Sequence, residues 1–137
     1  MGARILVIDD STKDLELASR LLQGAGHVLL TAQDGESGIA IAKRECPDLI
    51  VSDIGLPGMG GLEIARRIRR IAELARVPLV AFTGHTGPGD RELILAAGFN
   101  GYVAKSYSEE ALAQIEGFLP PELRSAGRPT LLKRPRR

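Results

Sequence analysis

The sequence contains few of the residues that mark disulfide-linked, thiolate-metal or membrane proteins. It has one cysteine among 137 residues, no tryptophan, and only three phenylalanines and two tyrosines. A single cysteine excludes an intrachain disulfide and a cysteine-based zinc site, as is usual in a reducing compartment. The longest uncharged apolar runs, such as Ile5–Ile8, are far shorter than the roughly 20 residues of a membrane-spanning helix. With no visible signal peptide or N-myristoylation pattern, we expect a cytoplasmic protein without membrane contact.

Motifs for nucleotide binding and for histidine-based metal binding are also missing. The glycine-rich segment 55–61 does not match the P-loop pattern, and no G-x-G-x-x-G follows the first apolar run. His27 and His85 lie far apart and have no partner at a metal-binding spacing. We therefore expect both histidines to be surface residues.

The net charge of +1 hides a difference between the two parts of the chain. Residues 1–119 carry a formal charge of −4, whereas residues 120–137 carry +5 and four prolines. This length fits one folded domain, and we predict that it spans residues 1–119 and is followed by a flexible basic tail, 120–137. The tail could be a solubilising end or an electrostatic contact for an acidic partner. Because no aromatic residue lies among its charges, specific nucleic-acid binding is disfavoured.

Short apolar runs alternate with helical patterns along the whole of the predicted domain. Ser11, Asp34 and Ser108 are candidate helix N-caps, and Ser11 and Asp14 have the spacing of a capping box. The runs are almost continuously hydrophobic, which indicates strands buried on both faces of a parallel sheet. We predict an α/β fold: a doubly wound five-stranded parallel sheet of flavodoxin-like order 2-1-3-4-5, with helices on both faces. The five predicted strands are Arg4–Asp9, His27–Thr31, Asp48–Ser52, Val77–Phe82 and Gly101–Ala104.

Polar side chains follow four of these five strands where each strand ends. Asp9 and Asp10 close the first strand, Asp53 follows the third, Thr83 the fourth and Lys105 the fifth. The carboxyl ends of parallel strands meet at one edge of the sheet, where α/β proteins bind their ligands. Any one of these residues alone fits a turn or a solvated surface position. Their joint placement predicts a site.

Three converging carboxylates repel one another unless one takes up a proton or a cation neutralises them. A hard divalent ion such as Mg²⁺ prefers oxygen ligands of this kind. A lysine ammonium and a threonine hydroxyl beside the ion can hold phosphoryl oxygens, and an aspartate can act as the nucleophile. The pattern therefore indicates phosphoryl transfer.

With these residues identified, the chain resembles the receiver domain of two-component response regulators over residues 4–119. The motifs that carry the resemblance are Ile8-Asp9-Asp10, the segment 53–61, Phe82-Thr83-Gly84 and the segment 101–105. The resemblance implies that Asp53 is the phosphoacceptor. It implies a Mg²⁺ (or Mn²⁺) site formed by Asp9, Asp10, Asp53 and the Gly55 carbonyl. It also implies that Thr83 and Lys105 hold the phosphoryl group, next to Gly84, and that Tyr102 is the aromatic switch residue.

The same resemblance implies a signalling role without an enzymatic activity other than self-phosphorylation and autodephosphorylation at Asp53. The expected partners are a histidine kinase or a histidine phosphotransfer protein, and a downstream protein that contacts the face formed by residues 88–119. A homodimer formed through that face is a further possibility. The same motifs would also suit a receiver-fold module that is not phosphorylated, or a receiver cut from a longer hybrid kinase. A hydrolase of the haloacid dehalogenase type is disfavoured, since the second acid of its Asp-x-Asp motif is Gly55 here.

The sequence departs from the receiver pattern at three positions. Ser106 follows Lys105 where the family usually has proline after a cis bond, so we expect either a trans bond or a strained cis bond. Gly55 replaces a larger side chain two residues after the phosphoacceptor, which should leave that side of the site open. Gly84 replaces the usual alanine after the threonine.

Overall fold

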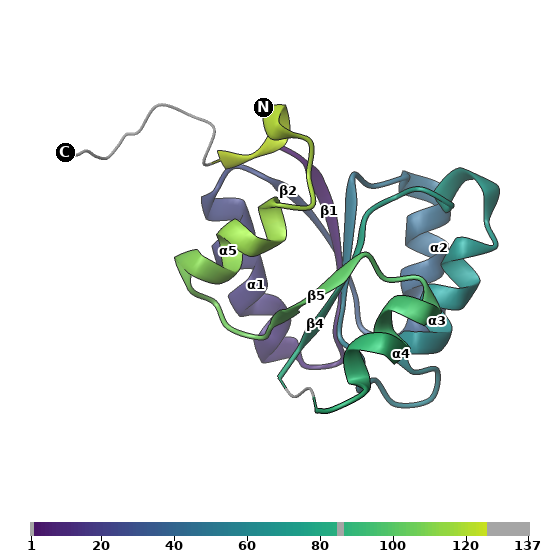
Figure 1. The fold of residues 1–137 in the computed structure, drawn as a ribbon. Helices are drawn as coiled ribbons and strands as arrows, with labels where there is room; N and C mark the ends of the chain where they lie inside the picture. Colours follow the sequence, from purple (N-terminus) through teal and green to yellow (C-terminus); the bar gives the residue numbers. More distant parts are fainter. Residues whose placement is uncertain (1, 85–86, 126–137) are drawn as a thin grey trace.

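The computed structural model describes residues 2–84 and 87–125. Strands and helices alternate along the chain, as the sequence predicted (Figure 1). The strands are β1 (Arg4–Ile8), β2 (Val28–Ala32), β3 (Leu49–Ser52), β4 (Leu79–Thr83) and β5 (Gly101–Ala104). The helices are α1 (Thr12–Gly24), α2 (Gly35–Glu45), α3 (Gly61–Arg69), α4 (Asp90–Ala97) and α5 (Glu109–Glu116), with short 3-10 turns η1 (Ala72–Leu74) and η2 (Pro121–Leu123).

The five strands form one parallel sheet in the order β2-β1-β3-β4-β5, which confirms the predicted topology. Its register brings the carboxyl ends of β1 and β3 together, with Ile8 opposite Ser52. Asp53, the first residue after β3, continues the pairing with β1, because its N–H donates to the Ile8 carbonyl at 2.9 Å. On the far side of β3, Ser52 pairs with Ala81, so β4 ends at the same edge.

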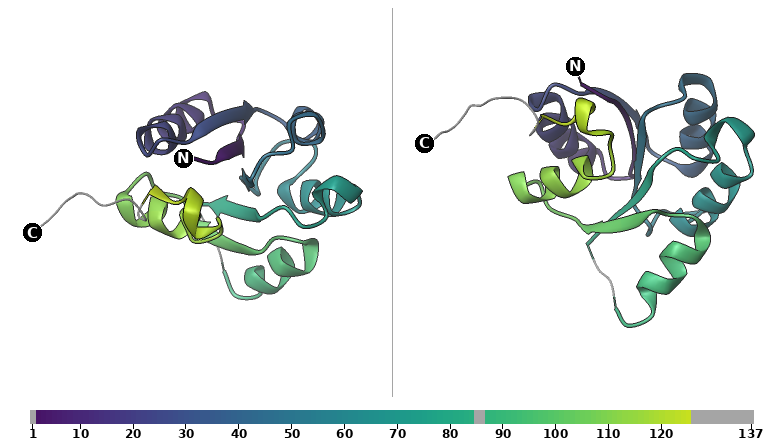
Figure 2. Two further views of the ribbon diagram at one scale, coloured as in Figure 1. Left: turned by 90° about the horizontal axis from the view of Figure 1, so that it is seen from above. Right: turned by 45° about the horizontal axis from the view of Figure 1, so that its top comes forward.

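Helices cover both faces of the sheet, and successive strand residues point into two separate cores. α1 and α5 lie on one face, and α2, α3 and α4 on the other, as both views in Figure 2 show. Ile5 and Val7 of β1 face the α1 and α5 side, whereas Leu6 and Ile8 face the other helices. Because β3 and β4 are buried along their whole length, the site at the ends of the strands rests on a rigid base.

Side-chain caps begin three of the helices where the sequence predicted them. The side chains of Ser11, Asp34 and Ser108 each accept a hydrogen bond from the backbone N–H three residues later. The predicted reciprocal contact from Asp14 back to Ser11 is not formed. The Ser11 N–H donates instead to the Asp9 carboxylate at 3.0 Å, which leaves the Asp14 side chain free for another partner.

The expectation that His27 is a surface residue is wrong. Its side chain is buried, and its Nδ1 accepts from the Ala3 N–H at 2.9 Å while its Nε2 lies 2.6 Å from the Glu116 carboxylate. This pattern fixes the tautomer, because an Nδ1 that accepts cannot carry the proton. His27 therefore joins the beginnings of β1 and β2 to the end of α5. His85 lies outside the described residues.

Two residues that follow the boundary expected at residue 119, Arg124 and Ser125, form hydrogen bonds at the end of α5. Ser125 donates to Glu116 from its backbone N–H at 2.9 Å and from its hydroxyl at 2.8 Å. Arg124 donates from Nε to the Leu119 carbonyl at 2.9 Å, next to the end of α5. Residues 120–125 are thus attached to α5, and the rest of the predicted tail lies outside the described residues. Across the described part of the chain, no helix combines the length and apolarity that crossing a bilayer requires.

Candidate functional site: an acidic cluster at the carboxyl edge of the sheet

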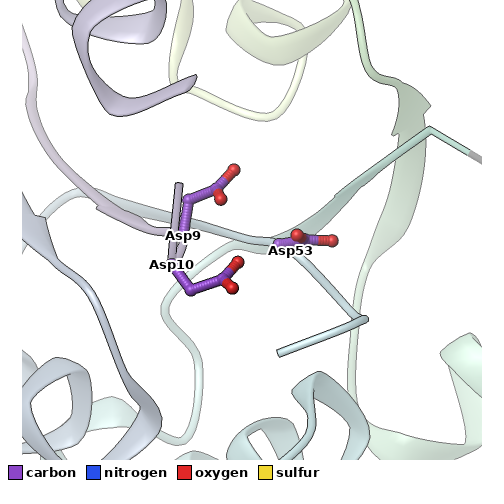
Figure 3. Close-up of side chains that lie close together, drawn as sticks. All are labelled: Asp9, Asp10 and Asp53. Atoms are coloured by element: carbon purple, nitrogen blue, oxygen red, sulfur yellow. The ribbon is translucent and has the colours of Figure 1, made fainter. Parts of the chain in front are cut away.

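Three aspartates that end β1 and β3 converge at the carboxyl edge of the sheet. One carboxylate oxygen from each of Asp9, Asp10 and Asp53 lies within 4.8 Å of the others (Figure 3). Asp9 is buried, Asp53 is half-buried and Asp10 is exposed, so the cluster opens to solvent on the Asp10 side. The sequence predicted this grouping from the ends of the strands alone.

Lys105 is the cation that faces this cluster. Its Nζ lies 2.7 Å from Asp9 Oδ2, 3.1 Å from Asp14 Oδ2 and 3.4 Å from Asp53 Oδ2. Burial disfavours the charge on the ammonium, but the hydrogen bonds to Asp9 and Asp14 and the charge of Asp53 outweigh it. They hold the pKa of Lys105 above its usual value. Lys105 is therefore a permanent cation at neutral pH.

The loop that carries Lys105 keeps an ordinary backbone in spite of Ser106. No cis peptide bond occurs among the described residues, so the Lys105–Ser106 bond is trans. The Lys105 N–H still donates to the Thr83 carbonyl at 2.8 Å and extends the pairing of β4 and β5. Of the two expected possibilities, the trans bond is the correct one, and it delivers the ammonium to the cluster.

The other predicted site residues surround the cluster at different distances. Thr83 is buried at the end of β4, and the Gly55 N–H donates to Asp53 Oδ1 at 3.2 Å. A Cβ at Gly55 or at Gly84 would meet nothing within 4 Å, so both sides of the site are open, as expected for Gly55. Tyr102 lies on β5 with 39% of its surface exposed and belongs to the outer face instead of the cluster.

Two residues near the site escaped the sequence analysis. Asp14, in the first turn of α1, reaches Lys105 at 3.1 Å, and this partner lies 91 positions away, so no local pattern signals the contact. The Tyr107 hydroxyl is buried without a hydrogen-bond partner among the described residues, and its ring packs edge-on against Phe82 at a centroid distance of 5.7 Å. Burial, and secondarily the nearby Asp14 charge, raise the pKa of Tyr107 to about 12.

The donor set of the cluster suits a hard divalent cation. The ion pairs that Lys105 forms with described residues go to Asp9, Asp14 and Asp53 and do not include Asp10. Among the described residues the ammonium thus pairs with three carboxylates, and the exposed Asp10 carboxylate is left outside these ion pairs. Mg²⁺ takes only a few carboxylates and keeps several waters, so it fits an acidic group that is open to solvent.

A doubly wound parallel sheet with an acidic, lysine-paired cluster at its carboxyl edge defines a class of α/β proteins that bind phosphoryl groups and divalent cations. The family model of the response regulator receiver domain matches residues 5–115. The chain belongs to this family, whose members are phosphoryl-accepting signalling modules and not typical enzymes.

Similar proteins agree with this assignment. The chain is 33% identical over 110 residues to protein PilH of Pseudomonas aeruginosa, covering 80% of this chain and 91% of PilH. Among solved structures, chemotaxis protein CheY4 of Vibrio cholerae superposes with a TM-score of 0.81 at 29% identity, covering 88% of this chain and all of CheY4. The receiver domain of the sensor histidine kinase PA1611 from Pseudomonas aeruginosa gives a TM-score of 0.78 at 30% identity, covering 86% of this chain and 98% of that domain. That structure has a magnesium ion coordinated in its active-site cleft.

Proposed function

We propose that Asp53 accepts a phosphoryl group from the phosphohistidine of a histidine kinase or a histidine phosphotransfer protein. The observation that carries this proposal is the convergence of Asp9, Asp10 and Asp53 around one opening, with the Lys105 ammonium on the buried side. In the transfer, an Asp53 oxygen forms a bond to phosphorus while the phosphorus–nitrogen bond breaks. The histidine ring leaves with the electron pair. Later attack by water on phosphorus returns the carboxylate and releases phosphate.

The residues around Asp53 have separate tasks in this reaction. Asp9, Asp10, Asp53 and the Gly55 carbonyl would hold Mg²⁺ (or Mn²⁺), which supplies positive charge against the phosphoryl oxygens when it is bound. Lys105 supplies a fixed charge from the opposite side, at 3.4 Å from Asp53. Thr83, at the end of β4, supplies a hydroxyl at the same edge of the sheet. The open space at Gly55 and Gly84 leaves room for the donor and for water.

The signal would leave the molecule through the face formed by α4, β5 and α5, residues 88–119. Leu93 and Leu95 of α4 and Tyr102 of β5 are exposed there, with 56%, 41% and 39% of their surfaces accessible. A hollow of about 400 Å³ opens between α4 and the end of α5, lined by residues such as Arg91, Leu95, Tyr102 and Phe118. An apolar surface with a hollow is suited to a protein partner, either a downstream target or a second copy. Tyr102 lies on this face, and we propose it as the aromatic switch residue.

The direct test is the mass of the intact protein after incubation with a small-molecule phosphodonor and Mg²⁺. We expect one phosphoryl adduct on the wild type, none on Asp53→Ala, and loss of the adduct when a chelator is added. Glu16→Gln is a matched control, because it removes an exposed carboxylate of α1 that pairs only with Arg20 among the described residues. A wild type that stays unmodified with small donors and with phosphohistidine donors would identify the chain as a receiver-fold module that is not phosphorylated.

The receiver of a longer hybrid kinase is the second candidate. The similarity to the receiver domain of the sensor histidine kinase PA1611 favours it, since the same fold serves there inside a larger protein. The mass experiment gives the same adduct in either case. The two candidates differ in their partners and not in the chemistry at Asp53.

A further inference from the structure

Asp14 competes with the reaction site for the charge of Lys105. The ammonium has three N–H donors, and three carboxylates surround it: Asp9 at 2.7 Å, Asp14 at 3.1 Å and Asp53 at 3.4 Å. All three donors are therefore in use before any phosphoryl group arrives. The longest of the three contacts is the one to Asp53, so the ammonium lies closer to Asp9 and Asp14 than to the proposed phosphoacceptor.

A phosphoryl oxygen can bind Lys105 only if one of these carboxylates gives up its contact. The Asp9 side chain is 4% exposed, and its other oxygen accepts from the Ser11 N–H, so its position is fixed. The Asp14 side chain is 30% exposed, the most of the three, and can be rehydrated at low cost when it leaves. Asp53 carries the phosphoryl group itself. Asp14 is thus the partner that can be displaced.

We propose that Asp14 is a positioning residue, which holds the Lys105 ammonium in the unphosphorylated protein and must release it when Asp53 is phosphorylated. The inference rests on the proposed function of Asp53. In the unphosphorylated state Asp14 stabilises the protein through a charge-assisted hydrogen bond. In the phosphorylated state this bond is lost and the Asp14 charge faces the added negative charge. Asp14 therefore shifts the equilibrium toward the unphosphorylated form.

The test compares phosphoryl occupancy in three proteins at a subsaturating concentration of acetyl phosphate with Mg²⁺. We expect Asp14→Asn to carry severalfold more adduct than the wild type, with a slower loss of the adduct after the donor is removed. Glu16→Gln removes the same charge from the same helix without touching Lys105, and should behave as the wild type. Thermal unfolding of the three proteins shows whether each variant is folded under the assay conditions.

A double-mutant cycle separates a role through Lys105 from simple repulsion by the Asp14 charge. In a Lys105→Met background, Asp14→Asn should no longer raise the occupancy, because no ammonium is left to be released. A gain that persists in this background overturns the inference, as does an equal gain in Glu16→Gln or equal occupancy in Asp14→Asn and the wild type. If the Lys105 variant carries no adduct, the inference is tested by Asp14→Asn and Glu16→Gln alone: it holds if only Asp14→Asn raises the phosphoryl occupancy. A wild type without any adduct overturns the proposed function itself, which is a different result.

Discussion

At the scale of single residues, buried charges in this molecule are held by more than one partner. Lys105 has three carboxylates, and Glu116, only 2% exposed, accepts from His27 and twice from Ser125. A buried charge is tolerated when hydrogen bonds replace the water that it loses. The two groups have different roles: Lys105 lies in the proposed reaction site, whereas Glu116 binds Ser125 at the end of the described chain.

Replacing Glu116 by Gln should lower the free energy of unfolding at neutral pH by roughly 1–3 kcal/mol, the usual loss for hydrogen bonds to a charged group. Burial opposes ionisation of Glu116, but the hydrogen bonds from Ser125 and His27 outweigh it and hold its pKa below the usual 4.5. A lowered folded pKa stabilises the protein above the unfolded value and loses this effect as the pH falls through the folded pKa.

The difference between the wild type and Glu116→Gln should therefore be fully present above pH 4.5 and become smaller below it. Urea unfolding at a series of pH values measures it. Glu122→Gln, an exposed acid in the adjacent turn η2, is the matched control. A difference that does not change with pH would mean that the charge of Glu116 does not contribute.

At the scale of elements, α3 approaches the backbone of the proposed phosphoacceptor very closely. A Cβ at Gly61, the first residue of α3, would lie 2.6 Å from the Asp53 carbonyl oxygen and 2.6 Å from Ile54 Cα. The Gly61 N–H also donates to the Ile54 carbonyl at 2.9 Å. Only glycine allows the helix to begin here, so the backbone position of Asp53 depends on the start of α3.

We expect Gly61→Ala to displace the backbone at Asp53 and to lower the free energy of unfolding by about 1–3 kcal/mol, as overpacking does. The rate of phosphorylation by a small donor should fall at the same time. Gly60→Ala is the control one residue away, because its Cβ would make only an ordinary contact at 3.7 Å. Equal behaviour of the two variants in denaturant unfolding and in the phosphorylation assay would contradict this explanation.

The elements also show how far the sequence predicts the structure. Continuous apolar runs predict buried parallel strands, and the residues after them must then meet at one edge, which is why Asp9, Asp10, Asp53 and Lys105 were correctly predicted to lie close together. The contacts that were missed join residues far apart in the chain. His27 and Glu116 are separated by 89 positions, and Asp14 and Lys105 by 91. No local pattern distinguishes Asp14 as a cap from Asp14 as an ion-pair partner.

The contacts of Arg124 and Ser125 could not be predicted for a related reason. Prolines and positive charges after residue 119 are typical of a flexible tail. Arg124 finds its acceptor on Leu119, just after α5, and Ser125 finds its acceptor on Glu116, the last residue of α5; only the folded structure brings them within reach. Composition indicates how a segment behaves in isolation. Whether it packs on the domain depends on the hydrogen-bond partners that the folded surface offers.

At the scale of the whole molecule, metal binding should be coupled to folding, because the acidic cluster exists only in the folded state. We expect Mg²⁺ to raise the melting temperature, with a stabilisation of about 2.7 kcal/mol at 100 times its dissociation constant. Asp10→Asn should lose most of this shift, whereas Glu16→Gln should keep it. Differential scanning calorimetry with and without a chelator, at constant ionic strength, makes the comparison. A shift of the same size with Na⁺ would indicate screening instead of binding.

The attachment of both ends of the described chain to one side of the sheet has a practical meaning. Ala3, just before β1, is hydrogen bonded to His27, and Ser125 is hydrogen bonded to Glu116, whereas Asp9 follows the other end of β1. In Figure 1 the N-terminus lies beside the last described turn, at the edge where β1 begins. Any load attached at either end, whether a bead, a surface or a neighbouring domain, pulls on the edge opposite the acidic cluster. The molecule can therefore be tethered by its ends while the acidic cluster faces free solution and stays accessible to a docking donor.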